Sequence, residues 1–126
     1  MTPVTKADIP TLRAAWWTWR ALRRARRGLP RAGVYGVTLP TPPVLPPHSE
    51  RGVRAVLRRR RATCLERSLV LQQWLVARGD PRDLVIGVIG PSDGFKAHAW
   101  LDGEDDRHPG TAPFRELTRI AARGSG

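Results

Sequence analysis

The chain has 126 residues, of which 40% are hydrophobic and 26% charged, a composition typical of one globular domain. A single cysteine excludes a disulfide framework and a cysteine-based zinc site, and we expect neither a metal nor a cofactor. No apolar run approaches the ~20 residues of a membrane-spanning helix, and the first residues lack the apolar segment of a signal peptide. We therefore expect a cytoplasmic protein.

The net charge of +11 is distributed unevenly along the chain. Residues 1–63 contain 14 Lys and Arg against 2 Asp and Glu, whereas residues 64–126 contain 8 against 9. This asymmetry indicates a basic docking segment attached to a compact unit. Within a single domain overall, we expect residues 1–48 to form a basic helix and a proline-rich linker. This segment would pack on, or dock to, a core formed by residues 49–126.

The first predicted element is an amphipathic helix over residues 9–28. Asp8 is suited to cap its start, and Gly28 with Pro30 is expected to end it. Trp17 falls off the apolar stripe and is expected to be exposed. The residues at helical spacing that we expect to face the core are Leu12, Ala15, Trp16, Trp19 and Leu22.

A proline-rich segment and a second basic helix follow. Residues 37–47 are expected to run extended over the surface, because repeated proline is incompatible with a helix or a central strand. The second helix is predicted over about 49–60, with Ser49 as its cap. Its inner stripe is expected to consist of Val53, Val56 and Leu57.

The helix that begins at Cys64 has the clearest predicted boundaries. Thr63 and Glu66 form the pattern of a capping box, which places Cys64 at the first helical position. Gly79 and Pro81 are expected to close the helix. Because unpaired N–H groups at a helix start stabilise a thiolate, Cys64 is a candidate nucleophile. The alternative is a small buried structural cysteine.

Two strands are predicted next, over residues 83–90 and 95–101. A short helix around 112–122 is the last expected element, with Phe114 and Leu117 returning to the core. In the second strand, alternation predicts one face with Phe95, Ala97, Ala99 and Leu101 and the other with Lys96, His98 and Trp100.

His98 is the candidate general base for Cys64. A cysteine at a helix start and a histidine on a following strand supply the two groups that nucleophilic catalysis by a thiolate requires. The N–H groups at the helix start, including that of Cys64, would then stabilise the oxyanion. The alternative is a half-buried strand histidine that is hydrogen-bonded for structural reasons.

Four blocks of sequence carry a family resemblance: C-L-E-R-S-L-V-L (64–71), L-V-I-G-V (84–88), F-K-A-H-A-W (95–100) and F-R-E-L (114–117). In this order they resemble the lasso-peptide leader peptidases, which are transglutaminase-like cysteine proteases of the microcin-processing type. The resemblance implies an α+β fold, with a papain-like core in which a cysteine-bearing helix packs on a small antiparallel sheet, preceded by a helical N-terminal segment. It also implies that Cys64 is the nucleophile, that His98 is the base and that an aspartate orients the imidazole.

The position of that aspartate is open. In similar proteins it lies on the strand after the histidine hairpin, about a dozen positions beyond the histidine, and here that count reaches Gly110. A two-residue turn would place Asp105 on the face of the histidine, whereas a three-residue loop would place Asp106 there. Asp102 lies in the turn and is expected to serve its backbone. We expect Asp106 to complete the triad, as the acid furthest from the tip.

The resemblance implies a cysteine peptidase that cleaves the leader from a ribosomally made lasso-peptide precursor and frees the core N-terminus for cyclisation. The implied partners are the precursor leader peptide and a separate leader-recognition protein of the RRE type, with the lasso cyclase as a further candidate. Two alternatives remain: a transglutaminase- or amidase-type acyltransferase of the same fold, and a non-enzymatic basic protein that binds nucleic acid or a membrane surface. We expect no nucleic-acid partner, because no nucleic-acid-binding module is recognisable.

Overall fold

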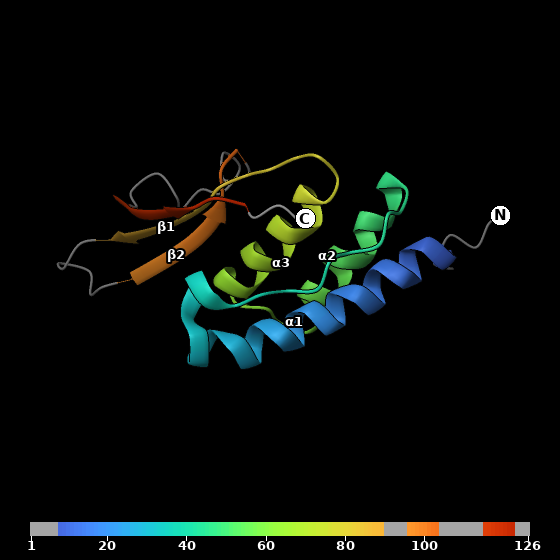
Figure 1. Cartoon of the computed structure of the whole chain (residues 1–126), viewed down its shortest axis with the longest axis horizontal. Helices are drawn as coiled ribbons and strands as arrows, with labels where there is room; N and C mark the ends of the chain where they lie inside the picture. Colours follow the sequence, from blue (N-terminus) through green and yellow to red (C-terminus); the bar gives the residue numbers. More distant parts are fainter. Residues whose placement is uncertain (1–7, 90–95, 104–114, 123–126) are drawn as a thin grey trace. The chain divides into compact units, whose positions relative to one another are not determined.

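The computed structural model describes residues 8–89, 96–103 and 115–122, and Figure 1 shows how their helices and strands follow one another. The first compact unit, Met1–Ala62, contains helix α1 (Ile9–Gly36), the 3₁₀ helix η1 (Pro47–Ser49) and helix α2 (Glu50–Arg59). The second unit, Thr63–Gly126, contains helix α3 (Cys64–Val76) and strands β1 (Leu84–Ile89), β2 (Lys96–Leu101) and β3 (Arg115–Ile120). The predicted α+β class is confirmed. The unit boundary follows Ala62, so α2 belongs to the first unit, whereas the sequence analysis grouped this helix with the core.

Helix α1 begins where the sequence predicts and ends later. The Asp8 side chain caps it by accepting a hydrogen bond from the backbone N–H of Thr11 at 3.0 Å. Hydrogen bonding by Thr11 lowers the pKa of Asp8 to about 2. The helix continues through Pro30, although an interior proline removes one N–H from the helical hydrogen bonds. The break that we predicted at Pro30 occurs at Gly33, whose φ of 73° is in the left-handed region.

The buried face of α1 carries small residues and packs closely on α2. Because Gly52 lacks a side chain, α2 can lie against the α1 backbone: a Cβ atom there would be 2.4 Å from the carbonyl oxygen of Thr11. Val53 and Leu57 of α2 are also buried. The small residues, which recur at alternating spacings of three and four, are Thr11, Ala14, Thr18, Ala21 and Ala25.

The face of α1 that we predicted to be buried is wrong. Leu12 and Trp16 are 56% and 61% exposed, although Leu22 is buried as expected. Trp17, expected to be exposed, is only 3% exposed, and its indole N–H donates to the carbonyl oxygen of Pro40 at 3.0 Å. The prediction from apolar spacing selected the wrong side of α1, because close packing of small side chains decides which side contacts α2.

The linker and α2 largely agree with the sequence analysis, with differences at Pro47, at the helix cap and at Val56. Residues 37–46 form neither helix nor strand, as predicted, whereas Pro47, which we also expected to be extended, begins η1. Ser49 makes no side-chain hydrogen bond to the start of α2; its hydroxyl donates to the carbonyl oxygen of Pro46 instead, so its predicted capping role is wrong. Val56, which we expected on the inner stripe, is half-buried.

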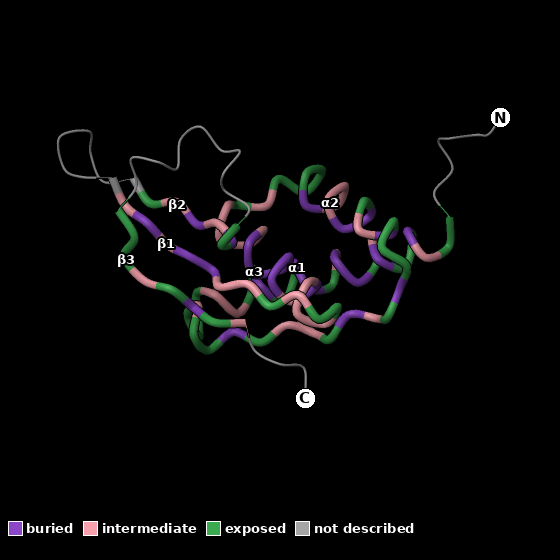
Figure 2. The backbone as a smooth tube through the Cα atoms, turned by 90° about the horizontal axis from the view of Figure 1, so that it is seen from above, coloured by how far each residue is buried: buried purple, intermediate pink, exposed green. Residues whose placement is uncertain are grey.

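In the second unit, α3 packs on a three-stranded antiparallel sheet with the order β2-β1-β3. The face that contains Leu84, Leu101 and Ile120 is buried, and β1 is the most deeply buried strand in Figure 2. Gln72 of α3 links helix and sheet, because its amide nitrogen donates to the carbonyl oxygens of Arg82 at 2.8 Å and Ile120 at 2.9 Å. These bonds supply a donor to one backbone carbonyl just before β1 and to one at the end of β3.

A strand replaces the helix that we predicted near the C-terminal end, and that prediction is wrong. β3 pairs with β1, and Leu84 lies opposite Ile120. Leu117 is 66% exposed rather than in the core, and Phe114 lies outside the described residues. The open edge of β1 decides the conformation here, since strand pairing depends on a distant partner more than on local propensity.

Candidate active site

Cys64 lies at the first position of α3, which a capping box holds in place. The hydroxyl oxygen of Thr63 accepts a hydrogen bond from the backbone N–H of Glu66 at 3.1 Å. In return, the Glu66 carboxylate accepts one from the backbone N–H of Thr63 at 3.0 Å. The predicted capping box is therefore confirmed, and it fixes the direction in which the half-buried Cys64 side chain leaves the helix.

The sulfur of Cys64 contacts the backbone of β2. The N–H of Ala99 donates to Cys64 Sγ at an N–S distance of 3.4 Å. β2 is an edge strand of the described sheet, so this N–H can point away from β1 toward the helix. Ala99 directly follows His98, and the start of α3 is thereby anchored next to the histidine on the strand.

His98 lies on a tightly packed face of the sheet. Its half-buried ring stacks on that of Trp100, with a centroid distance of 5.6 Å and an interplanar angle of 24°. Gly87 lies opposite His98 on β1, and a Cβ atom at this position would be 2.8 Å from the Trp100 indole. Gly87 thus makes room for Trp100, and Trp100 restricts where the imidazole can lie. Sequence analysis did not identify this role, although a glycine within an apolar strand is a signal of close approach.

Of the candidate acids, the structure describes Asp102 only. Its backbone N–H donates to the carbonyl oxygen of Asp83 at 2.9 Å, and its carboxylate accepts from the Arg119 guanidinium at 3.1 Å. Hydrogen bonds to Glu116 and then to Asp102 hold the pKa of Arg119 above its usual value. The contacts of Asp102 therefore support the end of the hairpin. Asp105 and Asp106 lie outside the described residues.

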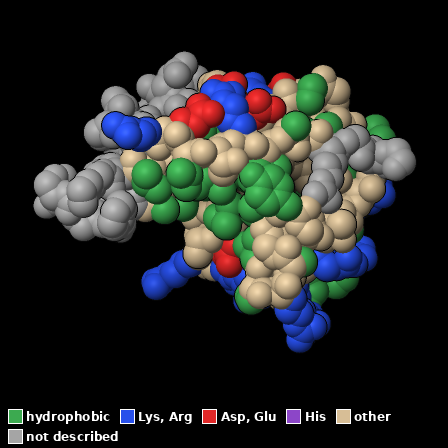
Figure 3. Space-filling view, turned by 60° about the vertical axis from the view of Figure 1, so that its left-hand side comes forward, with side chains coloured by type: hydrophobic (Ala, Val, Ile, Leu, Met, Phe, Trp, Pro, Cys, Tyr) green, Lys and Arg blue, Asp and Glu red, His purple; other side chains and the backbone are tan. Residues whose placement is uncertain are grey.

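The surface beside the sheet carries charges of both signs. Arg119 contacts three carboxylates, and Arg82 pairs with Asp80. On the face shown in Figure 3, acidic and basic side chains accordingly lie next to one another.

Among the described residues, no group of three or more His, Cys, Asp or Glu side chains could hold a metal ion. None of the described helices is long and apolar enough to cross a membrane.

Comparison with known proteins gives one result. The sequence model of the transglutaminase-like superfamily matches residues 9–121, which include α1 at one end and β3 at the other. No curated protein and no solved structure matches the chain.

Proposed function

Because the chain belongs to the transglutaminase-like superfamily, whose members are typically cysteine-dependent enzymes, we propose that it is a cysteine peptidase that removes the leader from a ribosomally made lasso-peptide precursor. The observation that carries the proposal is the contact between Cys64 Sγ and the N–H of Ala99, one residue from His98. It brings the lone thiol of the chain and a strand histidine to the same part of the fold.

The surroundings of Cys64 favour a reactive sulfur. A thiolate is stabilised by hydrogen-bond donors and by the positive end of a helix dipole. Cys64 has both, because it begins α3 and accepts from the Ala99 N–H. It is also partly accessible, as a nucleophile must be, whereas an inert structural cysteine is usually fully buried.

In the proposed reaction, the Cys64 thiolate attacks the carbonyl carbon of the last leader residue and forms a C–S bond. The N–H groups at the start of α3 stabilise the oxyanion. His98 gives a proton to the leaving nitrogen, the C–N bond breaks and the core peptide departs with a free amine. His98 then takes a proton from water, which attacks the thioester and releases the leader as a carboxylate. We assign to Asp106 the orientation of the His98 ring.

The choice of substrate rests on sequence blocks within the matched region. C-L-E-R-S begins at Cys64, and A-H-A-W surrounds His98, in the order and spacing that resemble the leader peptidases. The structure adds a reason for the second block: Ala99 contacts the sulfur, and Trp100 stacks on the histidine. We propose the leader peptide and a separate leader-recognition protein as partners, in the cytoplasm.

The test is cleavage of a synthetic leader–core peptide, followed by mass spectrometry. Cys64→Ala and His98→Ala should each reduce the rate by at least about a thousandfold, since nucleophile and base act as a unit. Leu117→Ala, which alters an exposed side chain of β3, is the matched control and should cleave as wild type does.

A second arm separates hydrolysis from acyl transfer. Adding a simple alkylamine should leave the leader product as a carboxylate. A leader that carries the amine as an amide would instead indicate a transglutaminase-type activity. Cleavage within about tenfold of wild type by either Cys64→Ala or His98→Ala would contradict the mechanism.

A further inference from the structure

We propose that the exposed face of α1 is a docking surface for a polypeptide segment of another protein, with apolar residues at one end and carboxylates at the other. This face, hereafter the α1 docking face, lies opposite the small residues that contact α2. It contains neither Cys64 nor His98, so the proposal is independent of the proposed chemistry.

The N-terminal half of the α1 docking face is apolar and exposed. Ile9, Leu12 and Trp16 are 71%, 56% and 61% exposed, and their spacing of three and four residues places them on one side of the helix. Trp16 stacks on Trp19, with a centroid distance of 5.3 Å and an interplanar angle of 19°. A row of large apolar side chains along one helix side is the pattern of a surface that a partner covers.

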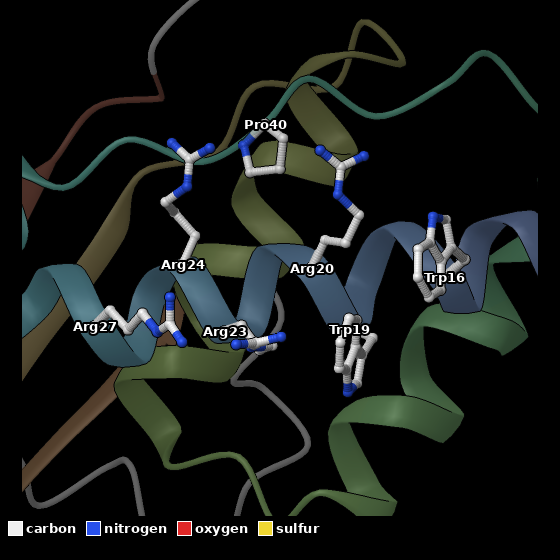
Figure 4. Close-up of a pocket in the computed structure, with 7 residues that line it drawn as sticks. All are labelled: Trp16, Trp19, Arg20, Arg23, Arg24, Arg27 and Pro40. Carbon is white, nitrogen blue, oxygen red and sulfur yellow. The ribbon is translucent and has the colours of Figure 1, made fainter.

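The C-terminal half of the same face is basic. Arg23 and Arg27 continue the row, and the Arg23 guanidinium lies over the Trp19 ring at 4.9 Å from its centroid. Figure 4 shows Arg20 and Arg24 extending on either side of Pro40, and these side chains line a hollow of about 340 Å³.

These arginines are available to a ligand. Within the part of the chain that the structure describes, none of the four forms a salt bridge. Planar guanidinium groups bind carboxylates through paired hydrogen bonds, so charge complementarity indicates an acidic ligand.

The change from apolar to basic residues along the α1 docking face favours a polypeptide over a nucleic acid as its ligand. Trp16 and Arg23 lie on either side of Trp19 in Figure 4, which leaves little of that ring for a base to stack on. A phosphate backbone has no apolar group that could cover the exposed side chains of Ile9 and Leu12.

A membrane surface also fits less well. An interfacial helix keeps apolar residues along its whole length with basic residues beside them, whereas here the apolar row ends at Trp19 and the basic row continues it. A peptide that changes from apolar to acidic residues matches this order.

The test compares four labelled probes on the full chain by fluorescence anisotropy or co-sedimentation. The first is a synthetic peptide with a leucine-rich half followed by a glutamate-rich half, and the second has lysine in place of glutamate. The third is single-stranded DNA, and the fourth is a vesicle of phosphatidylcholine and phosphatidylserine. Sedimentation velocity of the protein alone reports whether a second copy covers the face.

The variants divide the face into its two halves. Arg20→Glu with Arg24→Glu changes the basic half, and Trp16→Ala changes the apolar half. Arg58→Glu with Arg59→Glu, on exposed positions of α2, is the matched charge control. Circular dichroism verifies that each variant is folded.

We expect the leucine–glutamate peptide to bind at least about tenfold more tightly than the leucine–lysine peptide, and less tightly as salt is added. Each docking-face variant should weaken binding at least about fivefold, the control should change it by less than about twofold, and Cys64→Ala should leave it unchanged. The proposal is overturned if the leucine–glutamate peptide does not bind or if the control weakens binding equally. It is also overturned if DNA, vesicles or a second copy of the chain bind through this face more tightly than the peptide.

Discussion

The elements of the two compact units pack together in different ways. In the first, α1 and α2 approach through small side chains and Gly52, and three large apolar residues of α1, Ile9, Leu12 and Trp16, are left on its outer face. In the second, α3 covers the sheet with large apolar side chains, and Gln72 satisfies backbone carbonyls beneath it. The difference separates two tasks: the first unit presents a surface, and the second positions Cys64 next to β2.

Breaking the close helix contact should produce the largest loss of stability. Gly52→Ala would place a Cβ atom 2.4 Å from the Thr11 carbonyl oxygen, so we expect the free energy of unfolding to fall by about 2–3 kcal/mol. This sign is opposite to the usual gain from alanine in a helix. Gly79→Ala in the second unit meets open space at a φ of 82° and should cost about 1 kcal/mol. Urea denaturation compares the two, and equal effects would contradict the account of α1–α2 packing.

In the second unit, the tested feature is the pair of hydrogen bonds from Gln72 of α3 to two backbone carbonyls, instead of a close contact between helices. Gln72→Leu would remove the amide that donates to the carbonyl oxygens of Arg82 and Ile120, and we expect a loss of about 2 kcal/mol in the free energy of unfolding. Gln73→Leu, at the neighbouring and less buried position, is the control and should stay within about 0.5 kcal/mol of wild type. A loss from Gln73→Leu as large as that from Gln72→Leu would show that the amide contacts are unimportant.

Substitution of Gly87 tests how packing on the sheet positions the His98 ring. Gly87→Ala should displace the Trp100 ring, which stacks on His98, and slow peptide cleavage by roughly tenfold with the fold retained. Trp100→Phe removes the ring atoms that the new methyl group would meet, so the double variant should recover part of the rate. Cleavage assays with circular dichroism give the comparison. Full activity of Gly87→Ala would mean that this packing does not position the imidazole.

The smallest effect concerns the cap of α1. Because the pKa of Asp8 falls from 3.8 to about 2 on folding, its contribution to stability is complete above about pH 3.8 and is lost as the pH falls through about 2. Asp8→Ala should therefore lower the unfolding midpoint at neutral pH and converge with wild type in strong acid. Asp8→Asn keeps a neutral cap, and its stability should lack this pH dependence. Parallel pH dependence in the Asn variant and the wild type would show that another group titrates.

Local signals predicted much of the second unit. The capping box at Thr63 and Glu66 and the alternation from Ala97 to Leu101 depend on neighbours in the sequence, and both are confirmed, whereas Phe95 lies outside the described residues. The buried face of α1 and the strand β3 were not, because each depends on a distant partner: α2 at Gly52 for the first and the open edge of β1 for the second.

For the candidate site, the sequence predicted the residues but not the contacts between them. Residue type and position singled out Cys64 and His98, but no pattern in the sequence indicates that the Ala99 N–H contacts the sulfur or that Gly87 accommodates Trp100. The first contact arises from the packing of α3 on the edge of β2, and the second from the pairing of β1 with β2. The assignment of Asp106 remains a prediction from the hairpin count, since that residue lies outside the described part of the chain.

Covalent trapping tests the central claim most directly. The wild-type protein is mixed with a leader–core peptide, quenched in acid and analysed by intact-protein and tandem mass spectrometry. We predict a leader acyl group attached to Cys64 as a thioester, which hydroxylamine removes and Cys64→Ala lacks. Cleavage of the peptide by Cys64→Ala, or an acyl group attached to another residue, would contradict the assignment of Cys64 as the nucleophile.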